Sequence, residues 1–212
     1  MIRGRFIAFE GGEGAGKSTQ ARLLAEALQA RGLDVLVTRE PGGTRGAEAI
    51  RALLLGVEGE GWLPRAEALL FAAARADHVE RVIRPALEAG TWVVCDRFVD
   101  SSRAYQGGGS GLTDAEIMEV HRIGSCGLLP DLAVLIEVPP EEVAARLARR
   151  DAGEADRIGG RAADYHAKVG EAFSRLAASE PRRFVRIDGS GEVEATEALI
   201  LAAIRPLLEA RR

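Results

Sequence analysis

Short apolar segments alternate along the chain with longer segments whose apolar residues recur every three or four positions. We expect the first kind to form strands buried on both faces, and the second kind to form helices packed against them. The expected strands are Arg5–Glu10, Asp34–Arg39, Thr91–Asp96, Asp131–Val138 and Arg183–Ile187. The expected helices are Ser18–Ala30, Ala47–Leu55, Pro64–Glu88, Asp114–Ser125, Pro140–Arg150, Ala162–Ala178 and Glu192–Ala210.

This alternation predicts an α/β fold with three layers, in which a mostly parallel five-stranded sheet carries helices on both faces. The sequence shows no repeat, long linker or low-complexity tract, so we expect a single domain over residues 1–212. Ligands of such a sheet bind at the carboxyl ends of its strands. Three expected strands end in or next to charged residues there, namely Glu10, Arg39 and Asp96.

Composition excludes several classes of function. A net charge of −4 provides no basic field for a nucleic acid polymer, and no apolar run is long enough to span a membrane. The two cysteines, Cys95 and Cys126, are far apart, and residues 1–5 lead directly into the first strand. We therefore expect reduced thiols, no signal peptide and a cytoplasmic location. The chain contains no Asn, which thermophily and GC-rich codon usage explain equally well.

The segment Gly11–Ser18 fits the phosphate-binding pattern G-x-x-x-x-G-K-[ST], and it lies between an expected strand and an expected helix. Glycines allow successive backbone N–H groups to point at phosphate oxygens, Lys17 can reach the outer phosphates, and the Ser18 hydroxyl can ligate Mg²⁺. Only one other lysine, Lys168, occurs in the chain. The pattern predicts a P-loop NTPase fold. The expected nucleotide-binding residues are Gly11, Gly12, Glu13, Gly14, Ala15, Gly16, Lys17, Ser18 and Thr19.

Charged residues after two other strands suit the same chemistry. Asp96 follows four apolar residues, so we expect it to organise Mg²⁺ together with Ser18 rather than to be an exposed residue at a strand end. Arg97 offers a planar fork for phosphate. A turn containing Pro and two Gly would hold Arg39 and Glu40 at the end of the second strand, facing the loop; the alternative is a surface turn with a solvated ion pair.

Two further groups have both a functional and an ordinary interpretation. Phe71 and Arg75 share one helix face and could grip a flat heterocycle, or they could be a core ring and a surface cation. Residues 149–157 carry Arg149, Arg150 and Arg157 around a glycine. This segment fits a mobile lid, near 149–161, that brings Arg to the transferring phosphates, but it also fits a solvated loop.

Taken together, these segments resemble the bacterial thymidylate kinases over nearly the whole chain. The phosphate loop is common to many proteins, but the other motifs are more specific. They are residues 38–44 (TREPGGT), 70–75 (LFAAAR), 96–102 (DRFVDSS), 104–107 (AYQG) and 156–158 (DRI). Phe98 departs from the pattern, because many relatives have Tyr there.

The resemblance implies transfer of a phosphoryl group from ATP to dTMP with Mg²⁺, by a homodimeric enzyme of dTTP synthesis. Phe71 would stack on thymine, Arg75 would bind its edge, and Tyr105 would lie under the deoxyribose. The expected dTMP-binding residues are Glu13, Arg39, Glu40, Arg51, Phe71, Arg75, Arg97, Ser102, Tyr105 and Gln106. Gly14 within the loop indicates the type with lid arginines. The expected catalytic residues are Lys17, Arg97, Arg149, Arg150 and Arg157.

Other functions remain open on the sequence alone. A kinase for another nucleotide or nucleoside would share the loop and sheet but differ around Phe71–Arg75 and Ser101–Gln106. A GTP-driven switch protein would need an Asn-Lys-x-Asp segment, which a chain without Asn lacks. A binding module could retain the loop without turnover.

Overall fold

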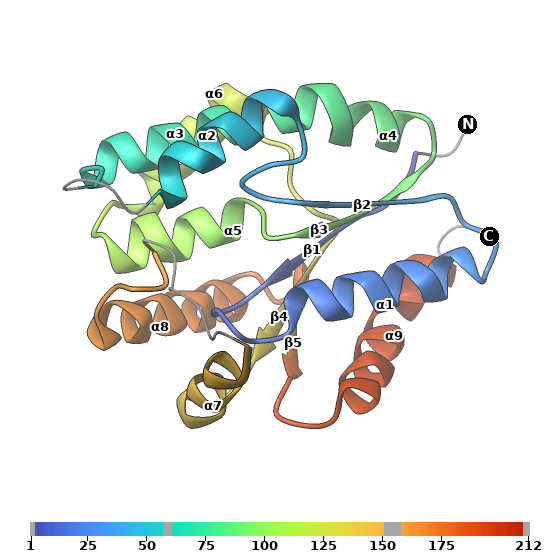
Figure 1. Ribbon diagram of the computed structural model, residues 1–212. Coiled ribbons are helices and arrows are strands. Elements are labelled where there is room, and N and C mark those ends of the chain that lie inside the picture. The colour runs from blue at the N-terminus through green and yellow to red at the C-terminus, as the bar shows by residue number, and fades with distance from the viewer. Residues whose placement is uncertain (1–2, 57–60, 151–157, 210–212) are drawn as a thin grey trace.

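A five-stranded sheet forms the centre of the molecule in a computed structural model that describes residues 3–56, 61–150 and 158–209 (Figure 1). The strands lie in the order β2-β3-β1-β4-β5, and every pairing among them is parallel. Their bounds are β1 Phe6–Glu10, β2 Val35–Arg39, β3 Trp92–Asp96, β4 Leu132–Glu137 and β5 Phe184–Asp188. The α/β sheet expected from the sequence is confirmed.

Helices cover both faces of this sheet because its strands are apolar on both faces. The α-helices are α1 Lys17–Gln29, α2 Arg45–Leu55, α3 Pro64–His78, α4 Arg84–Glu88, α5 Val99–Ser102, α6 Asp114–Ser125, α7 Pro140–Arg150, α8 Ala163–Ser179 and α9 Val193–Glu209. Two π-helical segments are η1 Val79–Ile83 and η2 Arg103–Gly109. Helices α1 and α9 lie on one face, whereas α3 to α6 and α8 lie on the other (Figure 1).

Alternate residues of each strand supply separate cores. Ile7 and Phe9 point to the face that α1 and α9 cover, where Leu24 and Ile200 meet them. Phe6 points to the opposite face. Both sides of the central strand are therefore buried, as its uninterrupted apolar sequence predicts.

Strand register brings the expected site residues to one edge of the sheet. Phe9 on β1 pairs with Asp96 on β3, and Arg39 on β2 pairs with the same Asp96. The loop that follows β1, the carboxylate that ends β3 and the turn that follows β2 are consequently neighbours. The charged residues that end these strands therefore meet at the carboxyl end of the sheet, where its ligands are expected.

Two helical segments differ from the expectation. The predicted single helix Pro64–Glu88 is helical throughout, but it is divided by the π-helical segment η1 between α3 and α4. Pro85 has no N–H group to complete the α-helical ladder, which accounts for the altered bonding just before it. Residues 99–109, where no helix was expected, form α5 and η2. The segment ends in three consecutive glycines, residues 107–109, and glycine has a low helix propensity, so the sequence did not indicate a helix here.

No helix in the described residues is both long and apolar enough to cross a membrane.

Candidate active site

The phosphate-binding motif forms a tight loop between β1 and α1. Gly11, Gly14 and Gly16 have positive φ angles of 131°, 68° and 91°. A side chain at Gly11 would also collide with the carbonyl oxygen of Ile136, since a Cβ there would lie 2.4 Å from that atom. Glycine is therefore required where the loop passes β4. The helix that follows begins at Lys17, so its free N–H groups face into the loop.

Lys17 and Ser18 lie at this helix start, where nucleotide phosphates bind in loops of this kind. The Lys17 ammonium is buried and donates to the carbonyl oxygen of Gly12 at 2.5 Å. Burial and the nearby Arg97 guanidinium lower the pKa of Lys17 to about 7. A polyanion bound beside it would favour its charged form. Binding of phosphate groups at the loop would therefore stabilise the protonated, positively charged form of Lys17.

Ser18 and Asp96 together fit a magnesium site. The Ser18 hydroxyl donates to Oδ2 of Asp96, and Oδ1 of Asp96 is buried without a hydrogen-bond partner in the part of the chain that the structure describes. An orphaned carboxylate oxygen beside a hydroxyl is a hard oxygen donor set. No cluster of three or more His, Cys, Asp or Glu side chains suited to a metal occurs among the described residues. Mg²⁺ needs none, because it takes one or two protein ligands and completes its shell with phosphates and water.

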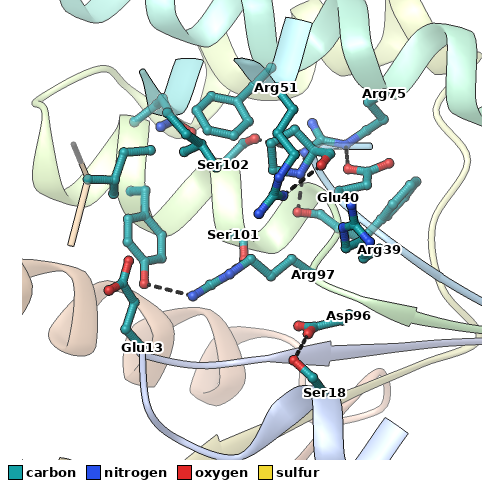
Figure 2. Close-up of a pocket in the computed structure, with 17 residues that line it drawn as sticks. Glu13, Ser18, Arg39, Glu40, Arg51, Arg75, Asp96, Arg97, Ser101 and Ser102 are labelled. Carbon is teal, nitrogen blue, oxygen red and sulfur yellow. Dashed lines mark hydrogen bonds and ion pairs between the residues drawn. The ribbon is translucent and has the colours of Figure 1, made fainter. Parts of the chain in front are cut away.

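A cavity of about 190 Å³ opens beside this pair, between the phosphate loop and helices α2, α3 and α5 (Figure 2). Arg39, Glu40, Arg51 and Arg75 gather on one side of it, and Glu13 lies on the other side (Figure 2). Its lining residues are Glu13, Ser18, Arg39, Glu40, Pro41, Arg51, Leu55, Phe71, Arg75, Asp96, Arg97, Phe98, Ser101, Ser102, Tyr105, Gln106 and Ile158. Every residue that the sequence assigned to dTMP lies in this lining.

Arg75 is fixed by a buried network rather than lying on the surface. Its side chain is 3% exposed, and its Nε donates to Glu40 Oε2 at 2.7 Å. Its Nη2 donates to Ser102 Oγ at 2.9 Å and to the Phe98 carbonyl oxygen at 3.3 Å. The second oxygen of Glu40 lies 3.1 Å from Nδ1 of His78. The interpretation of Arg75 as a surface cation is therefore wrong, and Glu40 has a partner for each of its oxygens.

Arg97 lies across the cavity floor, between Ser101 and Glu13 (Figure 2). Its backbone is left-handed, with φ 69°. Its guanidinium donates to the Gly11 carbonyl oxygen at 3.0 Å, to Ser101 Oγ at 3.1 Å and to the Tyr105 hydroxyl at 3.2 Å. It also stacks 5.0 Å from the centre of the Tyr105 ring. A cation held this firmly at the loop can receive an anion without first being ordered.

Glu10 supports Arg97 from beneath the cavity. The Glu10 carboxyl group is fully buried and accepts from the backbone N–H of Phe98 at 2.9 Å and from the Ser101 hydroxyl at 2.6 Å. Burial, reinforced by the neighbouring Asp100 carboxylate, raises the pKa of Glu10 to about 8. The two bonds fix the segment that directly follows the left-handed Arg97, whose backbone conformation costs about 1–3 kcal/mol.

Gln106 is held by a second carboxylate, Glu67. The Gln106 side-chain amide donates from Nε2 to Glu67 Oε1 at 2.9 Å, and Arg161 donates to the other oxygen, Oε2. Glu67 and Gln106 are both about 1% exposed. Arg161 also stacks 4.6 Å from the centre of the Tyr165 ring.

Two further arginines, Arg39 and Arg51, also line the cavity. Arg39 pairs with Glu48 at 3.0 Å, and its side chain is 55% exposed. Arg51 donates to the carbonyl oxygen of Pro41 at 2.8 Å. The peptide bond between Glu40 and Pro41 is cis. Arg39 reaches the cavity from the end of β2 and Arg51 reaches it from α2, so both bring positive charge to this side of the cavity.

A second cavity lies on the outer side of the phosphate loop. It is lined by Gly14, Ala15, Gly16, Thr19, Gln20, Glu142, Ala145, Arg146, Gly189, Ser190, Gly191, Glu192, Val193 and Thr196. Arg146 is fixed there by a bond of 2.6 Å to the Gly189 carbonyl oxygen. The loop therefore contributes residues to the lining of both cavities.

The structure does not describe the side chains of the three expected lid arginines, Arg149, Arg150 and Arg157. Arg157 belongs to residues 151–157, and the side chains of Arg149 and Arg150, at the end of α7, are likewise outside the described part of the structure. Their expected catalytic role stays a prediction.

Sequence reasoning missed His78, Glu67 and Ser101. A usable signal was present on α3, where Glu67, Phe71, Arg75 and His78 are spaced by four, four and three residues. Residues at these spacings share one face of a helix. A face that carries two ionisable groups and an arginine in an otherwise Ala-rich helix indicates a polar cavity rather than a core.

Comparison with known proteins assigns the family. The family model described as thymidylate kinase matches residues 9–200. The chain belongs to the thymidylate kinase family. A thymidylate kinase of Rhizorhabdus wittichii is 56% identical over 205 residues, covering 97% of this chain and 99% of that protein. A thymidylate kinase of Nitrobacter winogradskyi is 50% identical over 203 residues, covering 95% and 88%.

The fold comparison agrees. The crystal structure of thymidylate kinase from Ehrlichia chaffeensis aligns with a TM-score of 0.78 at 30% identity, covering 96% of this chain and 99% of that chain. The resemblance inferred from the motifs, the P-loop NTPase fold and the assignment as a kinase are thereby confirmed. Membership in the thymidylate kinase family makes the cavity beside Arg97 the candidate acceptor site.

Proposed function

We propose that this protein transfers the γ-phosphoryl group of ATP to dTMP, giving ADP and dTDP, and that it binds dTMP in the cavity beside Arg97. The observation that carries the proposal is the buried Arg75, fixed by Glu40 and Ser102 at a cavity that also contains an aromatic ring, Phe71. A ring that stacks and a guanidinium that donates suit a flat base with a carbonyl group on its edge.

The remaining lining residues supply contacts for the sugar and the phosphate. Tyr105 lies over Arg97 and provides an apolar surface for a deoxyribose, and Glu13 on the opposite side is an acceptor for its 3′-hydroxyl. Arg39 and Arg97 are cations of the cavity lining, and Arg97 also donates to the Gly11 carbonyl oxygen of the phosphate loop. An acceptor phosphate held between them would face the loop, which is the geometry that in-line phosphoryl transfer requires.

The chemical step needs no covalent enzyme intermediate. An oxygen of the dTMP phosphate forms a bond to the γ-phosphorus of ATP, and the bond from that phosphorus to the β–γ bridging oxygen breaks. The acceptor is already an anion, so no strong general base is required. Lys17, Arg97 and the backbone N–H groups of the loop stabilise the charge that spreads over the transferring group. Arg149, Arg150 and Arg157 are the candidates for an additional cation.

Ser18 and Asp96 would hold Mg²⁺, as the orphaned carboxylate oxygen described above indicates. When bound, the ion neutralises phosphate charge and orients the β- and γ-phosphates.

A panel of acceptor nucleotides tests the proposal. ADP release would be measured with ATP, Mg²⁺ and each of dTMP, dUMP, CMP and AMP. We expect dTMP to be preferred, and dUMP to be weaker because it lacks the methyl group that packs in the apolar part of the cavity. Equal turnover of CMP would refute the assignment of Phe71 and Arg75 to the base.

We further infer that the enzyme is a cytoplasmic homodimer. Three large apolar side chains are exposed on adjacent helices, Leu53 on α2, Leu69 on α3 and Ile123 on α6. Leu69 and the exposed Ala73 share a helix face, whereas Ala68 and Ala72 are buried. Sedimentation velocity of the wild type and of Leu69→Glu tests this assembly, and we expect the variant to sediment as a monomer.

A further inference from the structure

The Glu67 carboxylate determines which end of the Gln106 amide faces its pocket. Glu67 is buried, and its two oxygens accept from Gln106 Nε2 and from an Arg161 nitrogen. A carboxylate paired with a guanidinium is ionised, so it accepts hydrogen bonds and cannot donate them. The amide nitrogen of Gln106 must therefore face Glu67, and the amide oxygen Oε1 is left for the other side.

Gln106 lines the acceptor cavity together with Arg75. A guanidinium offers only donors, whereas an amide oxygen offers only an acceptor. A base that satisfies both must present a carbonyl oxygen beside a ring N–H. Thymine and uracil do this with O4 and N3–H. Cytosine presents an amino group and an unprotonated ring nitrogen, so both of its groups are mismatched.

We propose that Glu67, ion-paired with Arg161, is a specificity-determining positioning residue that sets the Gln106 amide to accept from the ring N–H of the acceptor base. The inference rests on the proposed function, because it deepens the account of the same cavity. Glu67 itself need not touch the nucleotide. It acts through Gln106, and Arg161 acts through Glu67.

The Arg161 guanidinium determines how the side chain at position 67 is oriented. Its guanidinium is fixed by stacking on Tyr165 and by a bond of 2.6 Å to the Tyr165 hydroxyl, which in turn donates to the Tyr105 carbonyl oxygen at 3.1 Å. In Glu67→Gln the new amide must turn its oxygen toward this cation, because two donors would otherwise face each other. Its NH₂ group then faces Gln106, and the Gln106 amide must invert to accept from it. The Gln106 side chain would then point its NH₂ group, a hydrogen-bond donor, into the cavity in place of its amide oxygen.

The test compares two nucleotides that differ only in the base edge that Arg75 and Gln106 would contact. dTMP and 5-methyl-dCMP share the ring methyl group, the sugar and the phosphate, and differ only in the O4/N3–H pair against the N4/N3 pair. Titration calorimetry on the full chain gives the dissociation constant of each without requiring turnover. We expect Glu67→Gln to weaken dTMP at least about tenfold, to leave 5-methyl-dCMP unchanged or tighter, and so to lower the selectivity ratio at least about tenfold.

A double-mutant cycle separates positioning from a general loss of structure. In a Gln106→Leu background the Glu67→Gln exchange should leave the selectivity ratio within about threefold, because no amide remains to invert. Glu80→Gln, on the helical segment that continues α3, exchanges an exposed carboxylate paired with Arg84 and is the matched control. It should leave both constants unchanged.

The outcomes distinguish this inference from the proposed function. If wild-type protein binds dTMP and phosphorylates it, but Glu67→Gln weakens both nucleotides by the same factor, then Glu67 is merely structural and the inference is overturned. A selectivity change that persists in the Gln106→Leu background also overturns it. If wild-type protein does not phosphorylate dTMP in the acceptor panel, the proposed function has failed first.

Discussion

The buried pair between Glu40 and Arg75 can be tested by an isosteric exchange, Glu40→Gln. Arg75 is 3% exposed and Glu40 is 4% exposed, and Nε and Oε2 are 2.7 Å apart. In the variant the Gln carbonyl oxygen can still accept from Arg75. His78 can adjust as well, because its other ring nitrogen lies 2.7 Å from the Thr38 hydroxyl and either tautomer can be satisfied. What is lost is the negative charge opposite a buried guanidinium.

The size of that loss follows from the burial of the pair. Removing one partner of a buried ion pair costs about 3–5 kcal/mol, and the retained hydrogen bond offsets about 1 kcal/mol of it. We therefore expect the free energy of unfolding to fall by roughly 3 kcal/mol, which for a chain of this size lowers Tm by about 6–12 °C. Arg75 also loses one of the groups that fix it, so KM for dTMP should rise about tenfold with a smaller change in kcat.

Urea denaturation and steady-state kinetics measure the two effects. Glu119→Gln is the control, since Glu119 pairs with Arg122 on the surface of α6 and both side chains are more than half exposed. Surface pairs of this kind contribute little, so the control should not change stability measurably. A Glu40→Gln protein as stable as the wild type would refute the reasoning, because it would mean that the charge of Glu40 does not stabilise the fold.

Further predictions concern the phosphate side of the site and the buried carboxylates. Lys17→Ala should lower kcat by orders of magnitude while dTMP still binds in calorimetry, since the proposed mechanism places Lys17 at the donor phosphates; unchanged turnover would remove it from the mechanism. Asp96→Asn should raise the Mg²⁺ concentration needed for half-maximal rate at least about tenfold, and an unaltered Mg²⁺ titration would contradict the metal assignment. Glu10 has its pKa raised to about 8, so the folded state holds its proton more tightly than the unfolded state, and this contribution to stability is lost as pH rises from about 5 to about 8. Glu10→Gln should flatten that part of the stability–pH curve, and an unchanged slope would mean that another group titrates.

The order of helices and strands could be predicted from the sequence because the inner strands β1, β3 and β4 are buried on both faces and therefore form uninterrupted apolar runs. Trp92–Cys95, for example, can be read as a strand without knowledge of its neighbours. The phosphate loop could also be predicted, since its glycines and Lys17 act through the local backbone. Their shared helix face singled out Phe71 and Arg75, and both line the cavity, but their contact with thymine was implied by the family resemblance and stays a prediction.

The network behind these residues could not be predicted, because its members meet only in the folded chain. Glu67 contacts Arg161, which is 94 positions away, and Glu10 contacts Ser101, which is 91 positions away. Nothing in either local sequence indicates the partner. The conversion of Arg75 from an apparent surface residue into a buried one depends in the same way on Glu40, from the turn after β2.

The sheet order has a consequence for how the protein is made. Of the strands of this sheet, β1 is translated first, and it occupies the middle of the sheet, between β3 and β4. Its second neighbour, β4, begins at Leu132, and the edge strand β5 begins only at Phe184. Such distant pairings form slowly, and a nascent chain exposes its apolar strands until they close. We expect the ATP-binding segment, although it is translated first, to become competent only near the end of synthesis. A stalled chain that ends before residue 184 should therefore bind no nucleotide and should be held by chaperones.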